Sequence, residues 1–564
     1  MSRRVFTPAL LALVIFMSLY SAHSFQGGEV VFEERGLDSL SGSPLRVVFV
    51  YPAERDKLAS KSAPAVIAIP PYSIPPEAMD IICTELAARG AACAIPDFFG
   101  KTEAESRQRM GEDSLRTMTQ DMITIVRYLR GLPFVDPDKI GSCGHSVGGT
   151  VSILTGMADP RVRSTVPIGM ESDFSQGRPQ NIMFISGLYD EIHSPENLLE
   201  NLTANGVTEN PQNRELYGSF EHGTAVQVNI LPTTDHFIET FDYFLIKDLL
   251  EWYARSFAEP GLAEGTLDHW WHKVSVFIFM LAFSVFYGVV GGRYSELLAE
   301  KAGSRVPHWL LVRLQALPLL LFVGLAWFLG DTYPGLRVGG LYLMVSLPIA
   351  QEFVSFRAAG MLRHPGTSPF RTMRALFFIC LALGAATLVS FGLVSIPNYV
   401  RFPEMLGWYP VFALNMLVLF PLEVWGRSLP PMFSETISGL TPATGYVILV
   451  AVVVLVPGLV LRVADRIAQE VVIAVRARLK PLYKIEERKP VALRRRVSPI
   501  MVIILLVLFA VLGFLVYRRI AEGMLTLETA GLAGLSILRF AVLPFILTAL
   551  IVRTRRFRKI AALE

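Results

Sequence analysis

The 564-residue chain has only four cysteines, and its positive and negative charges almost cancel. The cysteines form no C-x-x-C pair and show no other metal-binding spacing. We interpret them as small buried residues, although their positions leave a Cys83–Cys93 disulfide open. A net charge of +3 gives no reason to expect a nucleic-acid partner. The sequence thus predicts no metal and no cofactor, and it does not indicate an oligomeric state.

Apolar residues are abundant but unevenly spread. They make up 52% of the chain, and the mean hydropathy of +0.44 is too high for a soluble protein of this size. The length favours more than one domain. Up to about residue 258, short strand-like runs alternate with polar helices, and beyond it long apolar stretches dominate. We therefore expect a first domain over 25–258 and a membrane domain over 259–564.

The first 24 residues resemble a targeting signal. Arg3 and Arg4 precede an apolar run from Ala9 to Tyr20 that is too short to span a bilayer comfortably. Ala22-His23-Ser24 then offers small residues at the two positions that a signal peptidase reads. A twin-arginine start remains an alternative. In either case residues 1–24 predict a signal peptide, and the chain that follows should lie outside the cytoplasm.

The first domain is predicted to be an α/β layer. Its strand candidates are Leu45–Tyr51, Ala65–Ile69, Ala91–Ile95, Lys139–Cys143, Ser164–Ile168, Asn181–Ser186 and Val226–Leu231. Its helix candidates are Pro76–Arg89, Asp113–Leu132, Ser146–Met157, Pro195–Asn205 and Phe237–Phe257. Such alternation predicts a doubly wound, mostly parallel sheet covered on both faces. The short interval between Ile168 and Asn181 leaves no room for a lid domain, so the site should be open.

The second half contains eight apolar stretches. Each is close to the roughly 20 residues that a helix needs to cross a bilayer, and Trp270 with Trp271 suits an interfacial anchor at the first entry. The stretches cover 273–291, 309–329, 338–355, 375–396, 408–424, 443–461, 499–517 and 530–552. These segments predict an all-α multispanning domain with seven or eight transmembrane helices.

Basic loops predict the orientation of that domain. The positive-inside rule places three regions in the cytoplasm: the loop containing Arg357 to Arg374, the basic loop 462–498, and the C-terminal tail from Arg553 to Lys559. With the first domain outside, eight full crossings would put the loop 462–498 on the wrong side. One stretch between 408 and 461 is therefore expected to be re-entrant, which gives seven crossings of the cell membrane.

The most informative motif is Gly144-His145-Ser146-Val147-Gly148, a G-x-S-x-G sequence followed by Gly149. A strand-like run precedes it and a helix candidate follows it, which is the context of a nucleophile elbow. Glycines are needed there because no side chain fits where the turn crowds its neighbours. The alternative is a glycine-rich turn with a capping serine. The motif predicts Ser146 as a catalytic nucleophile.

Such a serine needs a base and a carboxylate, which follow it in this order of the chain: Ser, Asp or Glu, His. Asp190 follows the strand ending at Ser186, and His236 follows the strand ending at Leu231. The separations, 190 − 146 = 44 and 236 − 190 = 46, each leave room for one helix and one strand. We therefore predict the triad Ser146, Asp190 and His236. Less favoured alternatives are Glu191, His193 and His222, and we expect Asp235 to cap its loop.

The oxyanion of an acyl-transfer reaction needs two backbone N–H groups. One is predicted to be that of Val147, directly after the nucleophile. The other should come from the loop after Ile69, which begins Pro70-Pro71-Tyr72. Proline has no N–H, so Tyr72 is the first residue able to donate. A loop stiffened by proline with a surface tyrosine is the alternative.

Residues 45–258 resemble an α/β-hydrolase of the dienelactone-hydrolase-like branch, near the platelet-activating-factor acetylhydrolases and the cutinase-like polyester hydrolases. In the cutinase-like enzymes the residue matching Tyr72 donates the second oxyanion N–H. Dienelactone hydrolases proper use a cysteine nucleophile, so Ser146 departs from their pattern and lactone specificity is not implied. The second half resembles no family that we recognise. The matching segments are Ile69–Ser73, Asp136–Gly141, Gly144–Gly149, Gly187–Asp190 and Asp235–Phe237.

Together these features predict a membrane-tethered, extracytoplasmic serine hydrolase of carboxylic esters, with lipid-like or acylated substrates favoured by its location. A serine peptidase of the same fold is one alternative. A second is a transport or lipid-handling protein with an accessory hydrolase domain, for which polar residues in apolar stretches would be evidence. Such residues are Gln351, Glu352, Asn415 and Glu423, each also readable as interfacial because it lies near a stretch end.

Overall fold

In the computed structural model of the chain, the described residues are 30–58 except 43, 62–71, 76–98, 114–174, 179–275 except 191, and 395–423. A few isolated helical positions add to these, at 12–18, 20–21, 24, 278, 389, 392 and 547. The chain divides into two compact units. The first comprises residues 1–354 and 397–446, and the second comprises 355–396 and 447–564.

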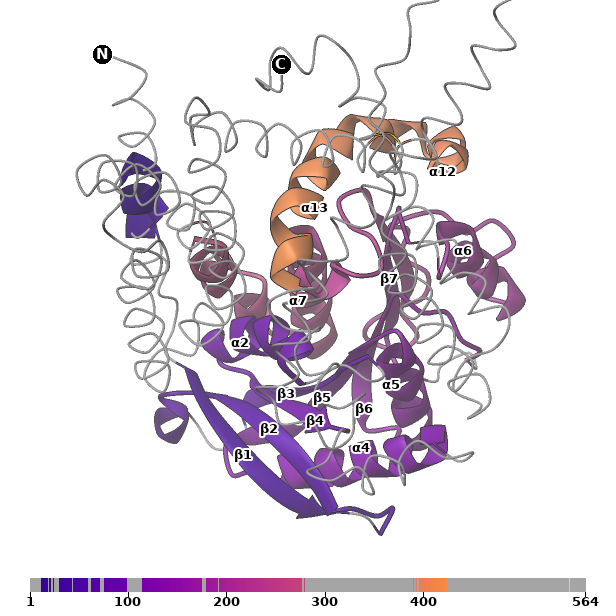
Figure 1. Ribbon diagram of the computed structural model, residues 1–564. Coiled ribbons are helices and arrows are strands. Elements are labelled where there is room, and N and C mark those ends of the chain that lie inside the picture. Colours follow the sequence, from indigo (N-terminus) through magenta and orange to yellow (C-terminus); the bar gives the residue numbers. More distant parts are fainter. Residues whose placement is uncertain are drawn as a thin grey trace, which may run out of the picture. The chain divides into compact units, whose positions relative to one another are not determined.

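The first unit contains an eight-stranded sheet with the order β1-β2-β4-β3-β5-β6-β7-β8. β1 and β2 pair antiparallel, as do β2 and β4, and every other neighbouring pair is parallel. The strands are β1 Val30–Asp38, β2 Pro44–Pro52, β3 Ala63–Ile69, β4 Ala92–Asp97, β5 Val135–His145, β6 Val162–Ile168, β7 Ile182–Gly187 and β8 Val226–Leu231. The predicted mostly parallel sheet is therefore confirmed (Figure 1).

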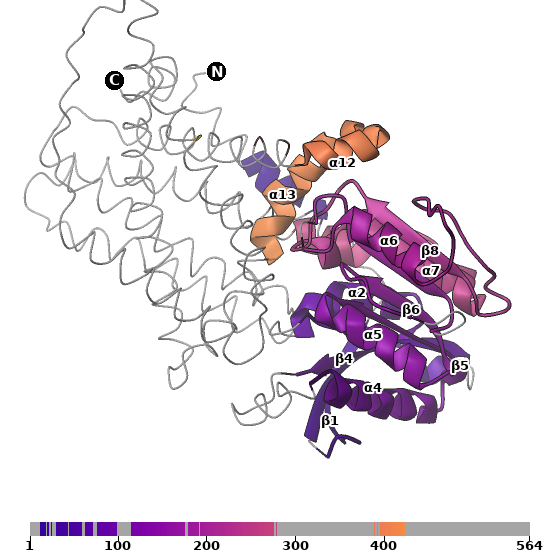
Figure 2. The ribbon, with the colours of Figure 1, turned by 90° about the vertical axis from the view of Figure 1, so that its right-hand side faces the viewer.

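Helices cover both faces of the sheet (Figures 1 and 2). In β5, Gly141 faces the rings of Tyr253 and Phe257 on α7, while the next residue, Ser142, bonds the Ser152 carbonyl on α5. This alternation is expected of a strand buried on both sides. The helices are η1 Arg55–Lys57, η2 Pro76–Met79, α2 Asp80–Ala88, α4 Ser114–Gly131, α5 Val147–Ala158, α6 Pro195–Ala204, η3 Glu239–Phe241, α7 Tyr243–Phe257 and η4 Pro260–Leu262.

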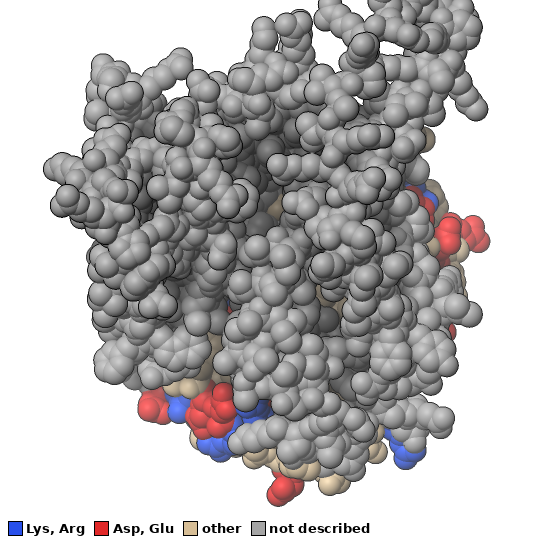
Figure 3. Space-filling model, viewed as in Figure 1, with Lys and Arg blue, Asp and Glu red and all other residues tan. Residues whose placement is uncertain are grey.

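One strand of the sheet, β1, is not among the strands predicted from the sequence. Apolar and polar residues do not alternate regularly along β1, and most of its side chains are exposed. Its sequence therefore lacks the apolar pattern of the other strands. It forms the edge of the sheet and carries charged pairs, such as Arg35 with Glu33 and Arg55 with the same carboxylate. Charged side chains on an edge strand oppose pairing with another chain. Figure 3 shows acidic and basic side chains together at the lower edge of the molecule, where β1 and β2 lie.

Cys83 in α2 and Cys93 in β4 form a disulfide, with their Cα atoms 5.3 Å apart. The sequence alone does not decide whether this bridge forms. Cys143 is buried in β5 and is free, and Cys380 lies outside the described residues. Burial raises the pKa of the Cys143 thiol to about 12, so this cysteine is a packing residue and not a reactive thiolate.

The packed part of the first domain continues beyond residue 258. Trp270, expected to be an interfacial anchor, is buried instead and donates its indole N–H to the Phe241 carbonyl. Its backbone N–H binds the Glu85 carboxylate, and Lys273 pairs with Asp80, so residues 270–273 pack on α2. The anchor prediction for Trp270 is therefore wrong, because its indole N–H finds a protein partner. Trp271 is exposed.

Within the described parts of the chain, no helix is both long and apolar enough to cross a membrane. The apolar stretch 408–424 forms α13, Tyr409–Glu423, preceded by α12, Ile396–Arg401, and η7, Pro403–Trp408. Residues 424 and beyond, apart from residue 547, lie outside the described part of the chain. The other predicted crossings lie wholly or almost wholly outside the described residues, as does the basic loop 462–498.

Candidate active site

Ser146 occupies a strained turn between β5 and α5. Its φ of 55° and ψ of −124° place a non-glycine residue where L side chains are rarely found. The neighbouring glycines allow the turn to close: a Cβ on Gly144 would lie 2.1 Å from the Gly148 carbonyl oxygen. The turn is thus the strand–elbow–helix arrangement that the motif predicted, and the serine at its tip is partly exposed.

The start of α5 packs tightly on the end of β3. A Cβ on Gly148 would lie 2.4 Å from the Ile69 carbonyl oxygen and 2.8 Å from that of Pro70. The loop that leads from β3 toward Tyr72 therefore begins directly beside the elbow, although residues 72–75 lie outside the described residues. Val147 is the first residue of α5, where a backbone N–H has no partner within the helix and remains available for a ligand.

Asp190 lies just past the carboxyl end of β7 and is buried. Its Oδ1 accepts the backbone N–H groups of Ile192 and His193, each at 2.8 Å. Its Oδ2 faces the ring of His236. Burial alone would raise the pKa of Asp190, but the charge and hydrogen bond of His236 outweigh it and hold this pKa below its usual value. The carboxylate is therefore ionised and fixed in one orientation.

His236 follows β8 and meets the predicted acid. Its Nδ1 lies 2.8 Å from Asp190 Oδ2, so the structure brings together two residues that are 46 positions apart in the chain. Its ring also packs against His145, the residue directly before Ser146, with centroids 4.6 Å apart. A carboxylate on Nδ1 favours the tautomer whose other nitrogen, Nε2, can accept a proton.

The alternative residues considered for the acid and the base do not take the place of Asp190 or His236. Asp235 accepts the backbone N–H groups of Phe237 and Ile238, and so caps its loop as predicted. His193 pairs with Glu171 at 2.8 Å, and its ring lies 5.6 Å from that of His236. His222 is exposed in a turn, and Glu191 lies outside the described residues.

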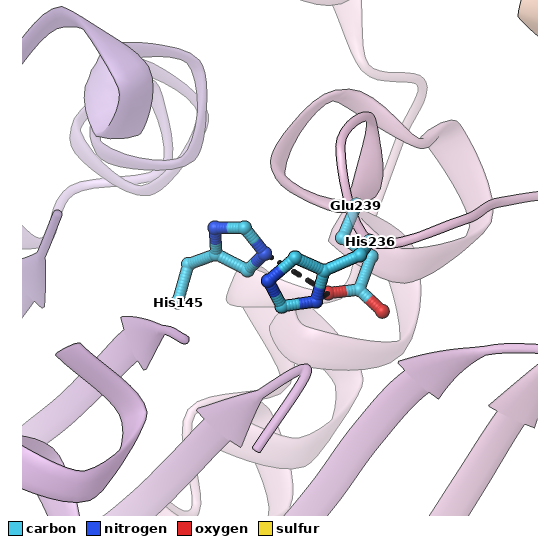
Figure 4. A group of neighbouring side chains, drawn as sticks. All are labelled: His145, His236 and Glu239. Atoms are coloured by element: carbon cyan, nitrogen blue, oxygen red, sulfur yellow. Dashed lines mark ion pairs between the residues drawn. The ribbon is translucent and has the colours of Figure 1, made fainter. Parts of the chain in front are cut away.

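Two further residues of the site, the buried Glu239 and the His145 that faces it, are not predicted by any sequence motif. Glu239 Oε1 accepts the Gly187 N–H at 2.7 Å and bonds the Ser186 hydroxyl at 2.9 Å. Its Oε2 lies 3.1 Å from His145 Nε2 and 3.9 Å from His236 Nδ1. Figure 4 shows the two imidazole rings converging on this carboxyl group. The elbow motif G-x-S-x-G accepts any residue at position 145, and Glu239 belongs to no motif. The sequence therefore predicts a site role for neither residue.

Glu239 and His145 are both held in their neutral forms. Burial, and then the negative charge of Asp190, keep the pKa of Glu239 well above its usual range. Burial, and then the positive charge of a protonated His236, keep the pKa of His145 well below its usual range. A proton on Glu239 Oε2 would be donated to His145 Nε2, which satisfies two buried atoms with one hydrogen bond.

His145, His236 and Glu239 also form the group of the described residues that offers metal-ligand chemistry, with ligand atoms within 4.8 Å of one another. Two features favour hydrogen bonding over a metal here. The 3.1 Å between His145 Nε2 and Glu239 Oε2 is a hydrogen-bond length. The Nδ1 of His236 is already bound to Asp190.

Comparison with known proteins agrees with this architecture. Residues 52–208 match the sequence model of the dienelactone hydrolase family. The chain is 26% identical over 146 residues to the acyltransferase drtE of Aspergillus calidoustus. This match covers 26% of this chain and 45% of that protein. The chain thus spans less than half the length of this curated relative.

Solved structures with a similar domain include a candidate dienelactone hydrolase from Klebsiella pneumoniae, which is 16% identical, with a TM-score of 0.30. That match covers 40% of this chain and 99% of the other. An α/β serine hydrolase without a lid from Xanthomonas campestris is 18% identical, with a TM-score of 0.29, over 40% of this chain and 94% of the other.

The sheet order, the elbow and the family match define the first domain as an α/β-hydrolase. Residues 52–208 match the dienelactone hydrolase family, in agreement with the branch that the motifs of this domain resemble, and this part of the chain has the α/β-hydrolase fold.

Proposed function

We propose that the protein is a serine hydrolase of carboxylic esters, with Ser146 as nucleophile, His236 as base and Asp190 as the orienting acid. The observation that carries the proposal is the 2.8 Å hydrogen bond between His236 Nδ1 and Asp190 Oδ2, beside a serine in a strained, partly exposed elbow. In acyl transfer the acid fixes the tautomer of the histidine, which then removes the serine proton.

The reaction has two halves. His236 Nε2 takes the proton of Ser146 as the oxygen attacks the ester carbonyl, and returns it to the departing alcohol. The acyl group stays on Ser146. Water, deprotonated by the same nitrogen, then attacks the acyl-enzyme and releases the carboxylic acid, and the proton returns to Ser146. Asp190 stays ionised throughout, because it is bonded to His236 and to two backbone N–H groups.

The oxyanion formed in each half is assigned to the backbone N–H groups of Val147 and Tyr72. Val147 supports this assignment because it begins α5 and its N–H lies at the positive end of the helix dipole. For Tyr72 the support is the proline pair before it and the contact of Gly148 with Ile69 and Pro70. That contact sets the start of its loop against the elbow.

Esters are favoured over peptides by the family match and by the absence of any lid insertion between β6 and β7, which residues 169–181 connect. The named relative is an acyltransferase, so an acceptor other than water is a natural variant of the same acyl-enzyme chemistry. A serine peptidase remains the alternative to be separated by experiment.

The site is assigned to the outside of the cell membrane, tethered by the apolar second half. Three observations support this location: the signal-like residues 1–24, the basic loops, and the Cys83–Cys93 disulfide, since such bonds persist in oxidising compartments. Lipid-like or acylated esters at the outer leaflet are the substrates that this location favours. The transport alternative loses Asn415 as support, because this side chain bonds the hydrolase domain.

The test is labelling of the purified full chain, in detergent, with a fluorophosphonate probe, followed by turnover assays. We expect covalent labelling at Ser146 and hydrolysis of para-nitrophenyl butyrate well above that of aminoacyl anilides. Faster anilide cleavage would identify a peptidase. Absence of both labelling and turnover would overturn the serine hydrolase assignment.

A further inference from the structure

Residues 398–415, more than 150 positions beyond His236, contact both loops that carry the proposed acid and base. They belong to α12, η7 and α13, and they lie in the same compact unit as the hydrolase domain. The sequence pattern predicts a loop and an apolar membrane stretch over most of this region. The contacts include hydrogen bonds as well as apolar packing. Hydrogen bonds are directional, so they fix which residue of this segment faces which residue of the loops.

The loop of the acid is held at three points. The Tyr189 ring, directly before Asp190, stacks on Phe412 with centroids 3.7 Å apart. Its hydroxyl lies 2.8 Å from the hydroxyl of Tyr399, and Asn398 donates its side-chain N–H to the Leu188 carbonyl. Tyr189 and Phe412 are both buried. These contacts fix the backbone from which the Asp190 side chain projects.

The loop of the base is tied at both ends by one amide. Asn415 Nδ2 donates to the Thr233 carbonyl at 3.0 Å and to Asp242 Oδ2 at 2.9 Å. Thr233 precedes His236 by three residues and Asp242 follows it by six. The other carboxylate oxygen of Asp242 caps α7 through the N–H groups of Phe244 and Leu245, so the far end of the tie is anchored in a helix.

Loss of the Asn415 amide would leave the buried Thr233 carbonyl and the buried Asp242 carboxylate each short of a donor. Unpaired buried groups cost free energy, and a loop can recover it by moving toward water. Catalytic groups must be held to about half an ångström to act. A shift of this loop would therefore act on His236 without any contact between Asn415 and substrate.

We propose that three residues of this segment, Tyr399, Phe412 and Asn415, form a positioning element of the active site. Asn415 holds the His236 loop, while Phe412 and Tyr399 hold the Asp190 loop. This inference rests on the proposed serine hydrolase function. It makes this one segment beyond the hydrolase domain part of the catalytic architecture. Any displacement of α13 would change both catalytic loops together.

The test compares full-length variants, purified in detergent, in para-nitrophenyl butyrate hydrolysis and in fluorophosphonate labelling. Asn415→Leu keeps the number of side-chain heavy atoms but removes both hydrogen bonds. We expect kcat to fall about tenfold or more, with little change in KM, and the pH profile to shift because His236 is held less firmly against Asp190. The neighbouring, exposed residue of the same helix supplies the control, Leu414→Ala, which should keep the wild-type kcat and pH profile.

A milder pair of variants guards against a simple loss of folding. Tyr189→Phe and Tyr399→Phe remove opposite sides of one hydrogen bond, so the double variant should lose little more kcat than either single one. If Asn415→Leu and both tyrosine variants keep the wild-type kcat and pH profile in an active enzyme, the positioning role is wrong while the hydrolase stands. Equal losses in Asn415→Leu and Leu414→Ala would also overturn it. A wild-type chain with no labelling and no turnover would instead refute the proposed function itself.

Discussion

Asp190 and Glu239 are joined by the hydroxyl of Ser186, whose Oγ lies 3.2 Å from Asp190 Oδ2 and 2.9 Å from Glu239 Oε1. Two carboxyl groups so close together in a buried site cannot both ionise at neutral pH. His236 stabilises the charge on Asp190, so the proton remains on Glu239. The site therefore holds one ionised carboxylate, Asp190, which bonds His236, and one neutral carboxylic acid, Glu239.

Removal of the proposed triad residues should abolish turnover. Ser146→Ala and His236→Ala should each lower kcat by about four orders of magnitude or more, and the double variant should be little worse, because triad residues act as a unit. The measurement is ester hydrolysis by the full chain. His222→Ala, at an exposed histidine outside the site, is the control and should retain activity. Near-normal turnover by Ser146→Ala would sink the mechanism.

The acid is tested separately with Asp190→Asn. If the amide oxygen keeps the two backbone N–H groups that Oδ1 accepts, its NH₂ must face His236 Nδ1. That contact favours the wrong tautomer of the base, so we expect a loss similar to or somewhat smaller than that of His236→Ala. Activity that survives Asp190→Asn but is abolished by Glu191→Gln would show that the acid is misassigned.

Glu239 should behave as a neutral hydrogen-bonding group. Glu239→Gln keeps an oxygen for Gly187 N–H and Ser186 and supplies an N–H for His145 Nε2, so kcat should stay within the same order of magnitude. Glu239→Ala leaves those groups unpaired and should lower the free energy of unfolding by about 2 kcal/mol or more. Equal damage by both substitutions would contradict a neutral Glu239.

The pH dependence of stability gives an independent measure of the same proton. Below the ordinary pKa of 4.5, folded and unfolded chains both hold it, and pH has no effect through this group. Between 4.5 and the raised folded pKa, only the unfolded chain releases it. Wild-type stability should then fall, relative to Glu239→Gln, by about 1.4 kcal/mol per pH unit. Unfolding of both proteins measured from pH 5 to pH 8 checks this, and parallel curves would contradict it.

A methyl group at Gly148 should disturb the elbow. Its Cβ would lie 2.4 Å from the Ile69 carbonyl oxygen, and this backbone cannot move without shifting the loop toward Tyr72. We expect Gly148→Ala to lower both kcat and the rate of fluorophosphonate labelling by about tenfold or more. Gly131→Ala, at the end of α4 with open space around it, is the matched control and should be neutral or slightly stabilising. Unchanged labelling of Gly148→Ala would contradict the assigned contact.

The proposed topology is tested with a reporter that is active only in the cytoplasm. Fused after Glu564 it should be active, and fused near Phe257 it should be silent, because the basic loops favour the cytoplasmic side. The reverse pattern would overturn the location of the hydrolase domain and with it the proposal of outer-leaflet substrates.

Local sequence was enough to predict the sheet and the positions of three site residues. Buried strands carry continuous apolar runs, and the carboxyl ends of parallel strands lie at one edge, so Ser146, Asp190 and His236 could be placed at that edge from strand order alone. β1 could not be found this way, because an exposed edge strand does not show the pattern that burial imposes.

Contacts between distant segments were decided by the tertiary structure alone. Glu239 reads as an ordinary loop acid, and only its complete burial beside Ser186, Asp190 and His145 makes it a neutral partner of the site. The sequence predicts Trp270 as a membrane anchor, but in the folded domain its indole N–H donates to the Phe241 carbonyl. The charge state or environment of such residues depends on which groups folding brings near them.

The sequence by itself thus determined the fold class of the first domain, the strand–elbow–helix turn at Ser146 and the chain order of the proposed catalytic residues, because these follow from local patterns of burial and turn geometry. Only the tertiary structure decided that Asp190 faces His236, that Cys83 bonds Cys93, and that Asn415 ties the loop of the base. A hydrogen bond between residues 182 positions apart leaves no periodic trace in either segment. It exists because the folded backbone places a donor against a buried carbonyl that would otherwise have none.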